Sequence, residues 1–108
     1  MSRLLVGSAD DFEENMPEAI EHNNKIILIV MNKGKFYAVD GLCTHQEVEL
    51  VDGKILDFGE CPQIVCPAHL GRFNLCTGKP TQKPPKTPLQ VYNVVIEDGN
   101  VYVEVENT

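Results

Sequence analysis

Two short motifs that pair a cysteine with a histidine constrain the fold of this chain more than any other feature. The motifs are Cys43-Thr44-His45 and Cys66-Pro67-Ala68-His69. Twenty residues separate the two motifs, and each offers one thiolate and one imidazole within the reach of a single loop. Two facing loops of this kind would present two sulfur and two nitrogen ligands to one metal centre. The fold therefore has to bring two loops together.

The rest of the chain consists mostly of short apolar or alternating segments, which are typical of strands. We expect strands over residues 3–6, 25–31, 35–39, 63–66, 71–75, 90–96 and 100–105. Turn residues separate several of them, and Asp98-Gly99 is a strong hairpin signal. A single helical turn is expected after Ser8, and the amphipathic segment 13–22 is interrupted by Pro17. The pattern predicts an all-β fold, either a small antiparallel sandwich or a barrel.

Composition narrows the function classes. The chain has 108 residues, 16 acidic against 9 basic side chains and a formal net charge of −7, so nucleic-acid binding is not expected. This charge favours partners with a basic docking face. The longest apolar run, Ile26 to Met31, is too short to span a bilayer, and the N-terminus shows no signal-peptide pattern. We therefore expect a soluble, cytoplasmic protein with no membrane partner, in which clustered Cys and His residues bind metal.

The paired motifs resemble the two ligand boxes of Rieske [2Fe–2S] proteins, Cys-x-His and Cys-x-x-His. The similarity covers essentially the whole chain. It includes Gly71-Arg72-Phe73-Asn74, Thr77-Gly78, the proline-rich loop that ends at Pro88, and the hairpin at Asp98-Gly99. The resemblance implies a Rieske-type antiparallel β-sandwich over residues 1–108. It also implies an inserted cluster-binding subdomain at about residues 42–80.

The resemblance also implies the ligands of one [2Fe–2S] cluster. Cys43 and Cys66 would bind the inner iron, and His45 and His69 would bind the outer iron. The function it implies is one-electron transfer between a flavin-dependent ferredoxin reductase and a terminal oxygenase of aromatic hydrocarbon catabolism, so the chain itself is not expected to be an enzyme. Residues 43–47 are similar to ferredoxins of toluene-type monooxygenases, whereas residues 73–78 are similar to those of ring-hydroxylating dioxygenases.

Two other functions are compatible with the ligand set. Two cysteines and two histidines also suit tetrahedral zinc, so the chain could be a zinc-stabilised binding module. Alternatively, it could be a Rieske subunit built into a larger oxidoreductase of the nitrite-reductase or arsenite-oxidase type.

Residues outside the boxes give further expectations. Cys61 and Cys76 are expected to be free thiols, at least one of them buried as a small hydrophobe. His22 is expected in an exposed turn, and the loop 79–88 is expected to shield the cluster. Respiratory Rieske proteins carry a Ser and a Tyr where this chain has Gly71 and Phe73, so the resemblance implies a reduction potential at the low end of the Rieske range.

Overall fold

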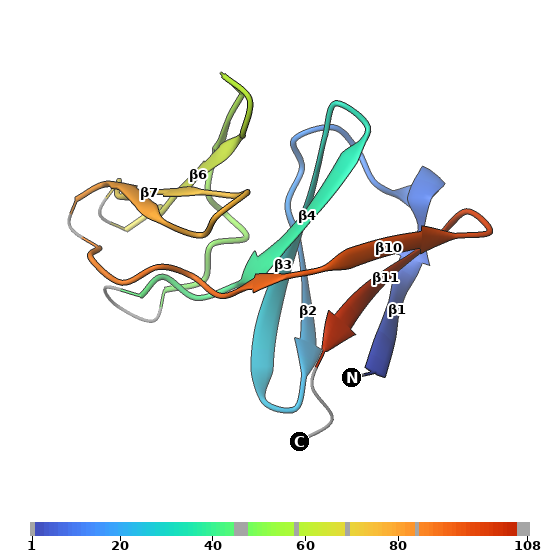
Figure 1. Ribbon diagram of the computed structural model, residues 1–108. Coiled ribbons are helices and arrows are strands. Elements are labelled where there is room, and N and C mark those ends of the chain that lie inside the picture. The colour runs from blue at the N-terminus through green and yellow to red at the C-terminus, as the bar shows by residue number, and fades with distance from the viewer. Residues whose placement is uncertain (1, 45–47, 58, 69, 84, 106–108) are drawn as a thin grey trace.

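The computed structural model describes residues 2–44, 48–57, 59–68, 70–83 and 85–105, and these residues form antiparallel sheets (Figure 1). The first sheet has the order β1-β11-β10, the second β2-β3-β4-β9 and the third β5-β6-β7-β8. The predicted all-β class is confirmed. The strands are β1 (Ser2–Ser8), β2 (Glu18–His22), β3 (Lys25–Asn32), β4 (Lys35–Asp40), β5 (Ile55–Leu56), β6 (Gln63–Val65), β7 (Arg72–Asn74), β8 (Pro80–Gln82), β9 (Val91–Tyr92), β10 (Val94–Glu97) and β11 (Asn100–Val105), and one 3₁₀ turn, η1, covers Ala9–Asp11.

The centre of strand β3, in the second sheet, is buried on both faces, which explains its continuous apolar run. Ile27 and Ile29 belong to a core shared with the first sheet, which includes Val101 and Val103 of β11. Leu28 and Val30, which alternate with them, belong to a second core shared with the third sheet. Side chains on a strand point alternately to its two faces, so a strand covered on both sides has no position left for a polar residue.

The second core joins the sandwich to the third sheet, and it contains two of the four cysteines. Its buried members from the third sheet and the adjoining loops are Cys43, Leu50, Ile64, Cys66, Phe73, Leu75 and Leu89. Figure 1 shows the third sheet and its loops at one end of the molecule, beside the sandwich that carries both termini. The candidate site therefore lies at the end of the molecule that contains the third sheet.

Two elements differ from the sequence-based expectations. The C-terminal half of segment 13–22 is strand β2, which pairs with β3 through a turn at Asn23 and Asn24. Both asparagines have positive φ angles, of 50° and 64°, which Asn tolerates better than most residues. The expected strand 90–96 is divided, because β9 pairs with β4 in the second sheet whereas β10 pairs with β11 in the first. Asn93 lies at this crossing between the sheets.

The expectation that Cys61 and Cys76 are free thiols is wrong, because the two residues form a disulfide bond. The register of the β6–β7 hairpin explains the pairing. Gln63 pairs with Asn74, and one residue further out the Leu75 N–H donates to the Pro62 carbonyl at 3.0 Å. The next pair in this register is Cys61 and Cys76, with Cα atoms 5.8 Å apart, inside the usual range for a disulfide. The crosslink therefore closes this hairpin at the end opposite its loop.

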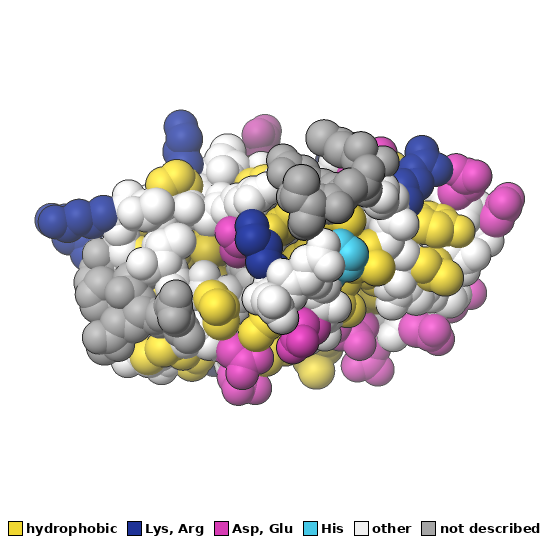
Figure 2. Space-filling model, turned by 90° about the horizontal axis from the view of Figure 1, so that it is seen from below, with side chains coloured by type: hydrophobic (Ala, Val, Ile, Leu, Met, Phe, Trp, Pro, Cys, Tyr) yellow, Lys and Arg dark blue, Asp and Glu magenta, His cyan; other side chains and the backbone are white. Residues whose placement is uncertain are grey.

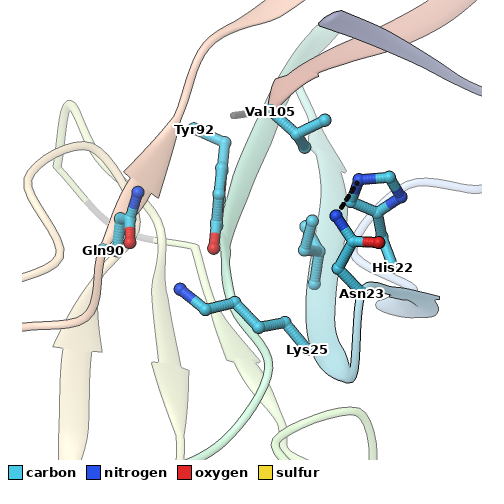
Figure 3. A pocket seen from close by; sticks show the side chains of 7 residues that line it. His22, Asn23, Lys25, Gln90, Tyr92 and Val105 are labelled. Atoms are coloured by element: carbon cyan, nitrogen blue, oxygen red, sulfur yellow. Dashed lines mark hydrogen bonds between the residues drawn. The ribbon is translucent and has the colours of Figure 1, made fainter. Parts of the chain in front are cut away.

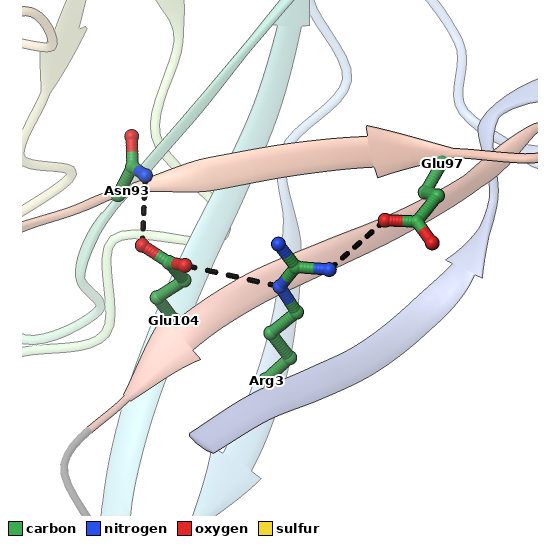
Figure 4. A network of polar contacts seen from close by, with 4 residues as sticks. All are labelled: Arg3, Asn93, Glu97 and Glu104. Atoms are coloured by element: carbon green, nitrogen blue, oxygen red, sulfur yellow. Dashed lines mark hydrogen bonds and ion pairs between the residues drawn. The ribbon is translucent and has the colours of Figure 1, made fainter. Parts of the chain in front are cut away.

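Polar contacts on the surface hold elements of the sandwich together. Arg3 on β1 forms ion pairs with Glu97, at 2.9 Å, and with Glu104, at 3.8 Å, and Glu104 also accepts a hydrogen bond from Asn93 (Figure 4). These groups are largely exposed, so we expect each pair to contribute less than about 1 kcal/mol. Within the described residues, no helix is long and apolar enough to cross a membrane.

One ion pair links the sandwich to the segment that leads into the third sheet. Lys33, in the turn between β3 and β4, lies 3.4 Å from the carboxylate of Asp57, just after β5. A hydrogen bond with Asn32 and the charge of Lys33 lower the pKa of Asp57 below its usual value. The contact therefore favours the ionised carboxylate, and any stability it contributes is lost when the pH falls through this lowered pKa.

Candidate metal centre

The first Cys-His motif lies in a loop that directly follows β4. The Cys43 N–H donates to the Val48 carbonyl at 2.8 Å, and the Leu50 N–H donates to the Gly41 carbonyl at 2.8 Å. An isolated bridge between Leu42 and Glu49 lies between these two contacts. The loop is thus closed like a short hairpin, and Cys43 is 2% exposed at its start. Backbone hydrogen bonds therefore hold the start of this loop in place.

The second motif lies in the loop of the β6–β7 hairpin. The Cys66 N–H donates to the Gly71 carbonyl at 2.7 Å, and the Leu70 N–H donates to the Cys66 carbonyl at 2.9 Å. Cys66 is 1% exposed, whereas Leu70 is 67% exposed and has a φ angle of 60°. The tight loop therefore buries the thiol and turns a leucine outward, in a backbone conformation that is uncommon for this residue type.

The two loops place their cysteines in the same way. In each loop the cysteine N–H bonds to the carbonyl of the residue five positions later, and the cysteine is the first residue of the closed segment. Neither Cys43 nor Cys66 forms a disulfide, and both belong to the same apolar core. The structure therefore brings the two predicted sulfur ligands into one core, where both are buried.

The two predicted nitrogen ligands, His45 and His69, lie outside the described residues, as do Gln46 and Glu47. Within the described part of the chain, no group of three or more His, Cys, Asp or Glu side chains could hold a metal ion. The donors of the two motifs that the structure describes are thus the sulfur atoms of Cys43 and Cys66. Two cysteine sulfurs, together with the two predicted imidazoles, would suit iron or zinc, because both metals bind thiolate and imidazole.

A third loop lies against both motif loops. It is closed at its base by the Leu89 N–H, which donates to the Gly78 carbonyl at 2.8 Å. The Thr44 hydroxyl of the first loop donates to the Thr87 carbonyl at 2.6 Å. Near the second loop, buried Pro85 occupies the space that a side chain at Gly71 would need. The proline-rich segment 79–88 therefore contacts both cysteine loops, as expected of a shielding loop.

These loop contacts were not predictable from sequence. Thr44 and Thr87 are 43 positions apart, and no local pattern pairs them. The lack of a side chain at Gly71 is what lets Pro85 approach, and no sequence pattern indicates this contact. The proline content of the segment was the one available signal, because proline stiffens a loop at low entropic cost.

A shallow pocket of about 130 Å³ lies apart from the cysteine loops, on the sandwich (Figure 3). Its lining includes Lys25, Gln90 and Tyr92, together with His22 at the end of β2. His22 is half-buried and lies 3.2 Å from the amide nitrogen of Asn23, so the expectation of an exposed turn residue is corrected. Of the motif residues that the structure describes, none lines this pocket.

Comparison with known families and proteins gives consistent matches. The model of the Rieske [2Fe–2S] domain matches residues 2–93. The ferredoxin component of the naphthalene 1,2-dioxygenase/salicylate 5-hydroxylase systems of a Ralstonia species is 37% identical over 97 residues, covering 90% of this chain and 89% of that protein.

Solved structures agree with the sequence matches. The ferredoxin of carbazole 1,9a-dioxygenase from Nocardioides aromaticivorans superposes with a TM-score of 0.91 at 28% identity, covering 98% of this chain and 100% of that one. A second similar chain was solved in a complex of reduced oxygenase and oxidised ferredoxin of carbazole 1,9a-dioxygenase. Its TM-score is 0.85 at 34% identity, covering 94% of this chain and 100% of that one.

Proposed function

The chain belongs to the Rieske [2Fe–2S] family, and from this premise we propose that it is the ferredoxin component of an aromatic-ring dioxygenase system. In this role it accepts one electron at a time from a flavin-dependent reductase and delivers it to a terminal oxygenase. The acceptor carries out the catalysis, and the chain itself is an electron carrier. We place this exchange in the cytoplasm.

Four residues are proposed to hold the single [2Fe–2S] cluster: Cys43 and Cys66 on the inner iron, and His45 and His69 on the outer iron. The observation that carries this assignment is the matched pair of closed loops, each of which buries one cysteine that forms no disulfide in the same core. We also propose that the cluster-binding subdomain spans about residues 42–80, which include β5, β6 and β7.

The residues around the proposed cluster site bury the sulfur ligands and hold the two ligand loops in place. When bound, the cluster supplies one-electron redox chemistry, and its two neutral imidazoles make reduction easier than an all-thiolate set would. Apolar side chains of Leu50, Phe73 and Leu89 bury the sulfur side and exclude water from it. The loop 79–88 rests on both ligand loops and holds them relative to each other through Thr44 and Pro85.

The proposed function predicts a low reduction potential. Gly71 and Phe73 carry no hydroxyl group, so neither side chain can donate a hydrogen bond to a ligand sulfur or to the cluster. Fewer such donors stabilise the reduced, more negative form less, and we expect a potential of about −150 mV, at the low end of the Rieske range.

Protein-film voltammetry of the purified chain tests this expectation. A one-electron wave at negative potential agrees with a ferredoxin that accepts electrons from a flavin. A clearly positive potential would instead place the chain with respiratory Rieske proteins and would contradict the proposed role.

A further inference from the structure

The acidic character of this chain does not extend to the segment that carries the second cysteine loop. Residues 61–96 contain Arg72, Lys79, Lys83 and Lys86 and no Asp or Glu, within a protein of net charge −7. By contrast, residues 42–60, around the first loop, contain five acidic residues and one lysine. The two segments that carry the cysteine loops therefore have net charges of opposite sign. Figure 2 shows dark blue side chains at the left-hand end of the molecule and most of the magenta ones away from it.

Two of these cations lie beside the ligand loops because of the proline-rich segment. Lys83 and Lys86 are exposed, and Pro85 between them packs on Gly71 of the second loop. One residue after Lys86, Thr87 accepts the hydrogen bond from Thr44 of the first loop. The backbone thus fixes both lysines next to the site, although their side chains remain in solvent.

An exposed apolar residue lies on the same side. Leu70 follows His69 directly, is 67% exposed, and is held at a φ angle of 60° by the turn that begins at Cys66. A leucine in this backbone region is uncommon and costs free energy, and such residues cluster at functional sites. Pro67 and Ala68, in the same loop, are also exposed, so the described residues on the outer surface of the loop are apolar.

We propose that Leu70, Lys83 and Lys86 form the surface on which the terminal oxygenase docks, with the leucine against an apolar area and the lysines facing carboxylates. This inference rests on the proposed function. An electron-transfer partner has to approach the ligand loops, and charge complementarity then requires an acidic area opposite the proline-rich segment. We commit to the oxygenase because a similar ferredoxin was solved bound to its oxygenase. The overall charge of −7 favours a partner with a basic docking face, and this expectation is reversed on this side of the site.

The first experiment uses small charged oxidants to test whether Lys83 and Lys86 lie near the point where the electron leaves the protein. The protein is reduced with dithionite, desalted and mixed with ferricyanide, which takes one electron and becomes ferrocyanide. At low ionic strength, Lys83→Gln and Lys86→Gln are each expected to lower the second-order rate constant about twofold, because a trianion is attracted by a nearby positive charge. With the trication hexaammineruthenium(III) as oxidant, the same variants should react faster.

Lys35→Gln is the matched control, because Lys35 is an exposed lysine on β4 of the sandwich. Its rate constants should remain within error of the wild type at every salt concentration. Equal effects of all three substitutions would show that only the overall charge matters, and this result would overturn the placement of Lys83 and Lys86 beside the electron exit. Unchanged reduction potentials establish that the cluster itself is unaffected.

The second experiment measures binding of the oxidised protein to the immobilised oxygenase component of carbazole 1,9a-dioxygenase. Leu70→Asn introduces a residue that tolerates a positive φ angle, so the loop conformation is retained while the apolar contact is lost. We expect about tenfold weaker binding to the oxygenase. The matched control is Leu5→Asn, since Leu5 is a 58% exposed leucine on β1, and it should bind like the wild type.

The outcomes separate this inference from the proposed function. Wild-type binding with no loss in Leu70→Asn would overturn the docking surface alone. If the variants of this surface were reduced more slowly by a ferredoxin reductase but still bound the oxygenase like the wild type, the surface would belong to the reductase. This result would overturn the choice of occupant. No electron transfer from the wild-type chain to the oxygenase would contradict the proposed function itself.

Discussion

The Cys66→Ser chain is expected to purify without the visible absorption of an iron–sulfur centre. Cys66 is 1% exposed, and its backbone is fixed by two hydrogen bonds within the loop, so no neighbouring donor can take its place. Serine keeps the size of the side chain but replaces a soft sulfur ligand with a hard oxygen. Removing a residue that hydrogen-bonds to a metal ligand lowers metal affinity roughly 10- to 100-fold. Replacing the ligand itself should lower the metal affinity by more than this. Iron and acid-labile sulfide per chain are the quantities to measure.

Cys43→Ser should give the same result, because Cys43 occupies the equivalent position in the first loop. Cys61→Ser is the matched control, since it removes a cysteine of the same hairpin that is bonded to Cys76 and not available to metal. Full cluster content in Cys66→Ser, with loss in Cys61→Ser, would show that the ligand assignment is wrong.

Removal of the disulfide is expected to have the second largest effect. The bond between Cys61 and Cys76 closes a segment with a sequence separation of 15, and loss of a crosslink around such a loop costs about 3 kcal/mol of stability. For a domain of this size, that corresponds to a fall in melting temperature of on the order of 10 °C. Calorimetry of Cys61→Ser/Cys76→Ser under anaerobic conditions measures the difference.

A phosphine reductant supplies the control for this prediction. It should lower the melting temperature of the wild type toward that of the double variant and leave the double variant unchanged. The crosslink also closes the hairpin that carries Cys66. Release of the cluster to an iron chelator should therefore be faster in the phosphine-treated wild type and in the double variant than in the untreated wild type. Equal melting temperatures for all samples would mean that the hairpin does not depend on the bond.

The sequence predicted those parts of the fold that depend on local chemistry. The run Ile26 to Met31 formed a strand because its residue types suit a buried position. The hairpin at Asp98 and Gly99 formed because both residues adopt positive φ, at 53° and 78°. The motifs predicted Cys43 and Cys66 as metal ligands, and the structure places both cysteines in one core, which no local pattern indicates.

The remaining features depend on register and on tertiary contact. The pairing of Cys61 with Cys76 follows from the register of β6 and β7, and that register is set by a loop in which Leu70 adopts a conformation its residue type does not predict. Strand β2 was obscured by Pro17, which lies just before the strand and does not interrupt it. The division of residues 90–96 at Asn93 reflects packing against two different sheets, which no local pattern encodes.

The most direct test of the account is pulsed paramagnetic resonance of the dithionite-reduced protein, together with a metal count on the same sample. The account predicts a rhombic signal from one coupled pair of irons per chain, with hyperfine couplings to two histidine nitrogens. A colourless, silent protein that contains one zinc ion per chain would contradict it. So would an iron–sulfur signal without nitrogen coupling, because the carrier would then lack the mixed ligand set on which its function depends.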